Sequence, residues 1–176
     1  CLVGSEMCIR DRAKQTGCGR TPWHFDDHHF PLDTNDVVTA WVPAQPIPLE
    51  MGPLSFAYPL DVYKLVKAVK FEKASTGYDC GVSNVFLKNN VSVNETPFEL
   101  GEVSFHHNLN FHTASSNRTN RSRVALANTY YRDGARVVNA PTMVSGDWQK
   151  FMPNVKPGDI AVSPLNPICW PIKDKS

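Results

Sequence analysis

The sequence has few cysteines, no long hydrophobic run and almost no net charge. None of its five cysteines belongs to a Cys-x-x-Cys pair, which argues against a disulfide framework or zinc ribbon and fits a reducing compartment such as the cytoplasm. No apolar run approaches the roughly 20 residues that a membrane span needs. The formal net charge of +1 gives no global attraction to nucleic acid or to an anionic membrane. We therefore expect a cytoplasmic protein that binds neither.

The first twelve residues differ in kind from the rest of the chain. Cys1–Arg12 resembles the in-frame translation of a transposon-type sequencing adapter, and such segments are excluded from fold reasoning. The alternative is an ordinary N-terminal segment. On the first interpretation the natural N-terminus, with any targeting signal, lies upstream, and 13–176 is one domain that lacks its N-terminal region. We then expect 1–12 to make no supporting contacts with the core.

Fourteen prolines and ten glycines divide the chain into short segments. Val62, Leu65, Val66 and Val69 have the spacing of one helical face and predict one amphipathic helix over 61–73. Runs of β-branched and aromatic residues predict short strands, at 37–42, 54–58, 83–87 and 124–131. Many short strands with a single helix indicate an all-β barrel or sandwich.

Residues 101–112 carry the clearest strand pattern. Polar and apolar residues alternate from Gly101 to His112, although Asn108–Asn110 could equally be a tight turn between two strands. The face that carries His106 is polar. This pattern suits a small barrel that holds a site in its mouth. The tail from Pro141 is rich in proline and is expected to form loops.

All six histidines fall in two clusters, at 24–29 and 106–112. His24 and Asp26 are two residues apart, so on a strand they would point to the same face. With His112 they would supply two imidazoles and one carboxylate, the ligands of the facial triad that leaves positions open on Fe(II). A His-x-Asp tripeptide is weak evidence alone. The first cluster is alternatively a solvated loop, and His106 and His107 are alternatively core histidines satisfied by hydrogen bonds.

Several further motifs make the chain resemble the phytanoyl-CoA dioxygenase family of Fe(II)/2-oxoglutarate oxygenases over roughly Lys14–Pro171. The motifs that carry this resemblance are Thr21–Asp26, Trp41, Met51–Phe56, Gly101–His107, His112, Asn117–Thr119 and Arg123. The resemblance implies a double-stranded β-helix, or jelly-roll, barrel. It also implies that iron is held by His24, Asp26 and His112.

The resemblance also implies which residues bind the co-substrate. It implies that Arg123 binds the distal carboxylate of 2-oxoglutarate, with Trp41 lining the same pocket; a guanidinium meets a carboxylate bidentately and stays charged. Arg118, Arg121 and Arg132 are nearby competitors for that role.

The chain departs from the family pattern next to two of these ligands. Phe25 replaces a common glutamine between the first histidine and the aspartate. Ala114 replaces a serine two residues after the distal histidine, so Thr113 or Ser115 would have to supply that hydroxyl.

The function implied is hydroxylation of an unactivated C–H bond in a small organic substrate, using dioxygen and releasing succinate and carbon dioxide. Because Asp26 keeps the carboxylate that related halogenases lack, we expect hydroxylation rather than halogenation. The alternative is a metal-binding cupin-like protein that is not an oxygenase, such as an isomerase or a binding module. That alternative explains the three ligands but gives no role to Arg123 together with Trp41.

Overall fold

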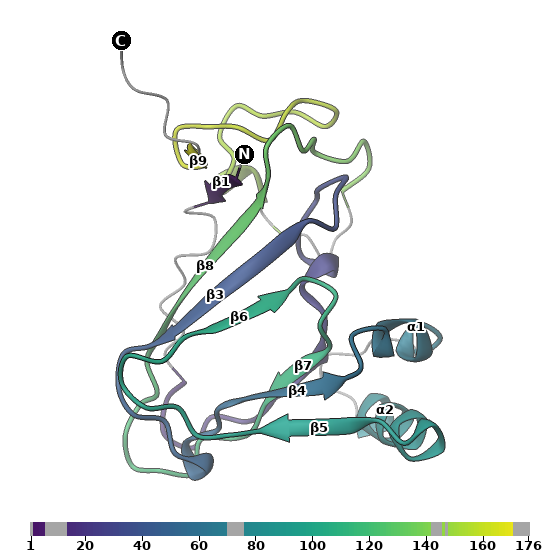
Figure 1. The fold of residues 1–176 in the computed structure, drawn as a ribbon, viewed down its shortest axis with the longest axis vertical. Coiled ribbons are helices and arrows are strands. Elements are labelled where there is room, and N and C mark those ends of the chain that lie inside the picture. The colour runs from purple at the N-terminus through teal and green to yellow at the C-terminus, as the bar shows by residue number, and fades with distance from the viewer. Residues whose placement is uncertain (1, 6–13, 70–75, 142–145, 147, 171–176) are drawn as a thin grey trace.

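The computed structural model describes residues 2–5, 14–69, 76–141, 146 and 148–170 (Figure 1). The strands are β1 (Leu2–Ser5), β2 (Thr21–His24), β3 (Val37–Pro43), β4 (Leu54–Tyr58), β5 (Ser92–Glu95), β6 (Ser104–His107), β7 (His112–Ala114), β8 (Ala125–Arg132) and β9 (Ile168–Trp170). The helices are α1 (Val62–Val66) and α2 (Thr76–Asn89), with 3-10 turns at Asp26–His28, Leu49–Met51 and Trp148–Lys150. No helix within these ranges is long and apolar enough to cross a membrane.

The strands form two antiparallel sheets. The larger has the order β6-β3-β8-β1-β9 and the smaller the order β2-β7-β4-β5. The predicted all-β class is confirmed, but the two sheets are not closed into a barrel. The edge strands β6 and β5 each pair on one side only within the described residues, so the structure is a sandwich of two sheets rather than a closed cylinder.

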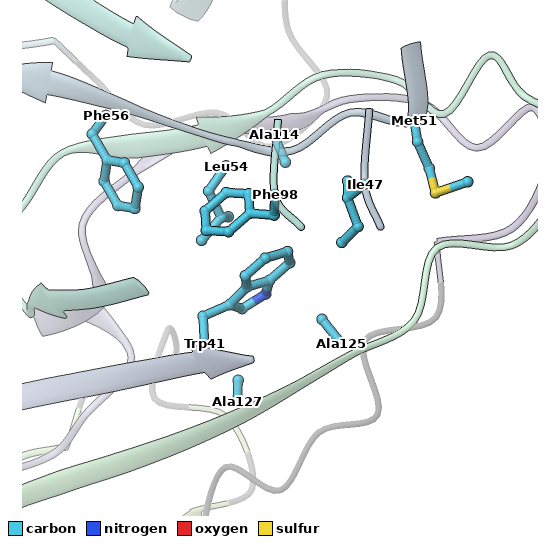
Figure 2. Close-up of a cluster of buried hydrophobic side chains, with 9 residues drawn as sticks. All are labelled: Trp41, Ile47, Met51, Leu54, Phe56, Phe98, Ala114, Ala125 and Ala127. Carbon is cyan, nitrogen blue, oxygen red and sulfur yellow. The ribbon is translucent and has the colours of Figure 1, made fainter. Parts of the chain in front are cut away.

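A hydrophobic cluster fills the space between the two sheets (Figure 2). Trp41 extends from β3 toward Leu54 and Phe98, while Ala125 and Ala127 line the same side on β8. Small residues on β8 leave room for the indole, whose ring centroid lies 5.0 Å from that of Phe98. This packing places Trp41 at the centre of the sandwich.

The other face of the smaller sheet is buried in part, at β4. Ala57 of β4 packs in a second cluster with Val62, Val66 and Val82 of the helices, which lie together beside β4 and β5 (Figure 1). The strand predicted at 54–58 is confirmed, and its first four residues are all buried, because the helices cover the side of β4 that faces away from the larger sheet.

Two predictions about helices were wrong. The segment 83–87, predicted as a strand, lies inside α2, because Tyr78, Val82, Val85 and Phe86 repeat at helical spacing and pack against the second cluster. The helix predicted over 61–73 is confirmed only for Val62–Val66, and 70–73 lies outside the described residues. The described residues therefore contain two α-helices where one was expected.

The segment from 101 to 112 contains a turn, as the alternative interpretation allowed. Asn110 N donates to His107 O at 2.8 Å and ends β6 before β7 begins. The faces of β6 follow the predicted alternation: Phe105 is 67% exposed and His106 only 4%. The histidine therefore points into the sandwich.

Both ends of the described chain join the larger sheet. The expectation that 1–12 makes no supporting contacts was wrong for Leu2–Ser5, which pair with β8 and β9; the rest of 1–12 lies outside the described residues. The free edge of β8 offers backbone groups that a strand of any sequence can pair with. The tail expected to form loops contributes β9, at Ile168–Trp170, which pairs with the other side of β1.

Candidate metal centre

His24 and His112 are directly opposite each other in the smaller sheet. His24 is the last residue of β2 and His112 the first of β7, and they are cross-strand partners. Their ring centroids lie 4.2 Å apart. Cross-strand pairing brings together two residues that are far apart in the sequence.

Asp26 approaches this pair from a turn and not from the strand. The predicted strand geometry for the His-x-Asp tripeptide was therefore wrong: β2 ends at His24, Phe25 is extended, and Asp26 begins the 3-10 turn. Even so, Asp26 Oδ1 lies 3.8 Å from His24 Nε2 and 3.9 Å from His112 Nε2. The ligand atoms of all three residues lie within 4.8 Å of one another, the spacing of a possible metal site.

Both histidines are oriented by a backbone carbonyl two residues before them. Nδ1 of His24 lies 2.8 Å from Pro22 O, and Nδ1 of His112 lies 2.8 Å from Asn110 O. A carbonyl oxygen only accepts, so each Nδ1 carries the proton and each Nε2 keeps its lone pair. Such outer contacts hold metal-ligating imidazoles in their tautomer and orientation.

The protonation states also suit a metal. Burial lowers the pKa of His112 well below its ordinary value, and the nearby His24 lowers it further. Burial alone would raise the pKa of Asp26, but His106, His112 and His24 outweigh it and hold the pKa below its usual range. Neutral imidazoles and an ionised carboxylate are the forms that bind a divalent cation. Two nitrogens and one oxygen, without thiolate, fit Fe(II).

One cavity joins the three residues to Arg123. Its lining includes, besides the triad, side chains from both sheets: Thr21, Thr39, Trp41, Leu54, His106, Thr113, Ala114, Arg123 and Ala127. The cavity therefore connects a possible metal site to a buried cation.

Arg123 is held in place from several sides. The residue is 4% exposed, and its backbone pairs with Lys14 through two hydrogen bonds of 2.8 and 2.9 Å. Its Nη1 donates to Gly52 O, and its guanidinium lies 5.6 Å from the Trp41 ring centroid. The competing arginines at 118, 121 and 132 are exposed. Of the four, Arg123 is the one that lines the cavity.

Gly52 allows this arrangement. Its φ of +74° is unfavourable for other residues, and a Cβ there would lie 2.1 Å from Ser115 O. The sequence motif that contains Gly52 was noted, but its role as acceptor for Arg123 was not. Lys14 was also missed: its Nζ donates to Ala114 O at 3.1 Å and Ser115 O at 2.6 Å, and it supports the chain behind the cavity.

The residues that depart from the family pattern have other partners. The hydroxyl of Thr113 donates to Thr21 O, although Thr113 does line the cavity. Ser115 Oγ donates to Glu95 at 2.9 Å and does not line it. Phe25 packs in the second hydrophobic cluster, where its ring lies 6.1 Å from Phe111. The Phe25 side chain is therefore part of the core and not of the cavity.

The remaining histidines separate into two groups. His28 is exposed, and His29 and His107 are half-buried, with His107 Nδ1 accepting from Leu109 N at 3.1 Å. His106 is buried in the cavity wall, as a core histidine would be, but its Nδ1 has no hydrogen-bond partner among the described residues. The expectation of a satisfied core histidine is therefore wrong for His106.

Known proteins share this sequence pattern and fold. Residues 5–125 match the family described as phytanoyl-CoA dioxygenase (PhyH). No curated protein matches the chain. Among solved structures, the non-heme α-ketoglutarate-dependent carbocyclase SnoK from nogalamycin biosynthesis superposes with a TM-score of 0.67 at 22% identity, covering 88% of this chain and 58% of SnoK.

Two further structures have the same fold. The epimerase SnoN, in complex with Fe3+, α-ketoglutarate and nogalamycin RO, gives a TM-score of 0.61 at 18% identity over 94% of this chain and 64% of SnoN. The non-heme monooxygenase ThoJ gives 0.55 at 16% identity over 80% and 49%. This chain thus spans less than two thirds of each relative. The match over residues 5–125 covers more than half of the 176 residues, and the jelly-roll fold agrees with it; the chain belongs to the phytanoyl-CoA dioxygenase family.

Proposed function

We propose that the protein is an Fe(II)- and 2-oxoglutarate-dependent oxygenase that acts on a small organic substrate. The observation that carries this proposal is the single cavity that contains both the convergent His24, Asp26 and His112 and the buried Arg123. A ketoacid with a second carboxylate needs both features, a metal at one end and a cation at the other. Membership of the family supports the same assignment.

Each residue of the candidate site has a defined part in this proposal. His24, Asp26 and His112 hold the iron and leave coordination positions open. Arg123 pairs with the distal carboxylate of the co-substrate. Iron and 2-oxoglutarate, when bound, supply the activation of dioxygen, with release of succinate and carbon dioxide. The two sheets exclude water from the reacting groups.

Trp41 supports, independently of the metal ligands, the proposal that the cavity suits an anionic co-substrate. Its indole Nε1 is buried and has no hydrogen-bond partner among the described residues, a state that usually has a functional or solvent-related explanation. An anionic ligand in the cavity would accept from it. Trp41 also limits the width of the cavity beside Arg123.

We propose hydroxylation as the reaction outcome, because Asp26 supplies the carboxylate ligand whose absence would open a site for halide. Related structures also include a carbocyclase and an epimerase, so product analysis has to decide. Asp26→Ala is expected to abolish turnover, and the wild-type protein is expected to give no chlorinated product in the presence of chloride. A chlorinated product from the wild type would contradict hydroxylation.

The second candidate is a cupin-like metal protein that is not an oxygenase. The buried Arg123 and the orphaned Trp41 nitrogen weigh against it, because a metal site alone requires neither. Incubation with Fe(II), 2-oxoglutarate and oxygen, with succinate as the readout, separates the two. Anaerobic binding of 2-oxoglutarate to the Fe(II)-loaded protein provides a readout that needs no substrate.

Two variants control this experiment. Arg123→Ala is expected to weaken 2-oxoglutarate binding by more than about tenfold, whereas Arg121→Ala, which changes an exposed arginine two residues away, is expected to keep the affinity of the wild type. A wild-type protein that binds Fe(II) but neither binds nor converts 2-oxoglutarate would contradict the oxygenase and favour the cupin-like alternative.

A further inference from the structure

A row of three buried polar residues crosses the larger sheet opposite the triad. Thr39 of β3 is the cross-strand partner of His106 on β6 and of Thr129 on β8. His106, Thr39 and Thr129 are 4%, 6% and 1% exposed. Residues paired in this way point to the same face of a sheet, and His106 and Thr39 line the cavity that contains the triad. The larger sheet therefore presents polar groups to a metal centre that is built on the smaller one.

This row faces one particular oxygen of Asp26. Oδ1 is the oxygen closest to His24 and His112. Oδ2 instead lies 3.2 Å from Thr39 Oγ1 and 3.7 Å from His106 Nε2. The two oxygens therefore have different neighbours: one faces the metal-binding imidazoles, and the other faces the larger sheet.

The hydroxyl pair fixes the direction of the bond from Thr39. An ionised carboxylate only accepts, so Thr39 gives its proton to Oδ2. Thr129, 3.0 Å from Thr39 Oγ1, then donates to Thr39. A proton directed in this way holds Oδ2 on the side of the larger sheet.

The ring of His106 completes this contact. Nε2 is the nitrogen that faces the carboxylate, and a lone pair in that position would repel it, so Nε2 carries the proton. At 3.7 Å the pair is longer than a hydrogen bond but lies within the range of direct electrostatic attraction. The other nitrogen, Nδ1, has no partner among the described residues, and the Phe56 ring lies 5.3 Å away. A phenylalanine would fill this apolar surrounding without leaving a polar atom unsatisfied, so packing alone does not explain a histidine.

We propose that His106 is a positioning residue for the metal ligand Asp26. Together with Thr39 it retains Oδ2, so that Asp26 binds the metal through Oδ1 alone. A carboxylate that binds through one oxygen occupies one coordination position and leaves the others for co-substrate and dioxygen. The inference rests on the proposed function for the identity of the metal, but its test measures metal binding without turnover.

Four variants test it on the full chain under anaerobic conditions. His106→Phe keeps an aromatic ring and removes both nitrogens. His106→Gln returns an N–H donor near the position of Nε2, whereas His106→Asn places its amide near the position of Nδ1. His107→Phe is the matched control, since His107 is adjacent on β6 but is not part of the cavity wall.

The measured quantities are the affinity for Fe(II) and the visible spectrum of the Co(II)-loaded protein, which reports the coordination of the metal. Loss of an outer contact to a metal ligand typically weakens binding about 10- to 100-fold. We expect this loss in His106→Phe and His106→Asn, together with an altered Co(II) spectrum. His106→Gln should recover most of the affinity, and His107→Phe should match the wild type.

An affinity and a spectrum of His106→Phe equal to those of the wild type would overturn the inference. If His106→Phe does not fold, the comparison of the two amide variants decides: equal affinities of His106→Gln and His106→Asn would overturn it. A wild-type protein that binds Fe(II) but does not convert 2-oxoglutarate would contradict the proposed function and leave the role of His106 supported by its own measurement. The two failures are thus distinct.

Discussion

His24 and His112 present the same nitrogen to the same point because each bonds, through Nδ1, to the carbonyl oxygen two residues before it. The two bonds have the same length, 2.8 Å, and the two residues are cross-strand partners. The partner is a backbone carbonyl in both cases, so the orientation of both imidazoles follows from the backbone of β2 and of the turn before β7.

Replacing one of these imidazoles should remove the metal. His112→Ala is expected to lose stoichiometric Fe(II), because two ligands from this set do not hold a divalent ion against water. His28→Ala is the control, since His28 is exposed and outside the cavity. Metal content after anaerobic loading and desalting measures the difference. Retention of Fe(II) by His112→Ala would exclude His112 as a ligand.

Removing the buried cation should weaken binding of the co-substrate. Arg123→Ala leaves the distal carboxylate unpaired in an enclosed cavity, a loss of about 2–5 kcal/mol for a buried pair. The concentration of 2-oxoglutarate needed for half-maximal binding should rise by more than about tenfold, equivalent to roughly 1.4 kcal/mol. Titration of the Fe(II)-loaded protein measures it. An unchanged requirement would exclude Arg123 as the partner of the distal carboxylate.

Gly52→Ala should affect both stability and co-substrate binding. The positive φ costs an alanine about 1–3 kcal/mol, and the new Cβ would also meet Ser115 O at 2.1 Å. The shift needed to relieve that contact moves the carbonyl that accepts from Arg123. Urea unfolding and 2-oxoglutarate titration should both show a loss.

Gly101→Ala is the control that separates the effect of Gly52→Ala on stability from its effect on co-substrate binding. Gly101 also has a positive φ, +96°, but a Cβ there would meet nothing within 4 Å. Gly101→Ala should therefore lose some stability and keep full co-substrate affinity. Equal effects of the two alanines on affinity would contradict the role assigned to Gly52.

Lys14 should make stability depend on pH in the alkaline range. Burial, with Arg123 close by, lowers its pKa from 10.5 to about 8. Between these values the unfolded chain holds a proton that the folded chain lacks, so Lys14 makes the free energy of unfolding rise with pH from about 8 to 10.5. Below pH 8 both states are protonated and the cost of burying the charge is present in full.

Lys14→Met isolates this contribution from other alkaline titrations. Burial raises the pKa of Tyr78 to about 12, which acts in the opposite direction, because the unfolded chain then releases its proton first. The difference in free energy of unfolding between the wild type and Lys14→Met, measured in urea at pH 7.5 and pH 10, should therefore shift in favour of the wild type at the higher pH. A difference that does not change with pH would contradict the shift.

Local patterns predicted the strands that are long and buried. The segments 37–42 and 124–131 consist of β-branched, aromatic and small residues, and they form β3 and β8 within a residue or two of the predicted ends. The segment 83–87 has a similar composition and is helical, because the hydrophobic face that includes Tyr78 and Val82 packs under the smaller sheet. Composition alone could not distinguish a strand from a helix here, because the packing of this segment against the smaller sheet decides the outcome.

The residues of the candidate site could be predicted from the sequence, but their arrangement in space could not. The two histidine clusters, together with the resemblance to the family, pointed to His24, Asp26, His112 and Arg123, and the structure brings all four to one cavity. The place of Asp26 on a turn was not predictable, because the end of β2 depends on its pairing with β7. Thr39 and His106 were missed as neighbours of Asp26, since their proximity arises from the way two sheets face each other.

Because Asp26 contacts Thr39 of β3 while its partner imidazoles belong to β2 and β7, a bound ion would act as a cross-link between the two sheets. An ion that binds only the folded chain stabilises it by about 2.7 kcal/mol when its free concentration is 100 times its Kd. Amide hydrogen exchange would then slow in both sheets on loading, including β3, which supplies no ligand to the metal.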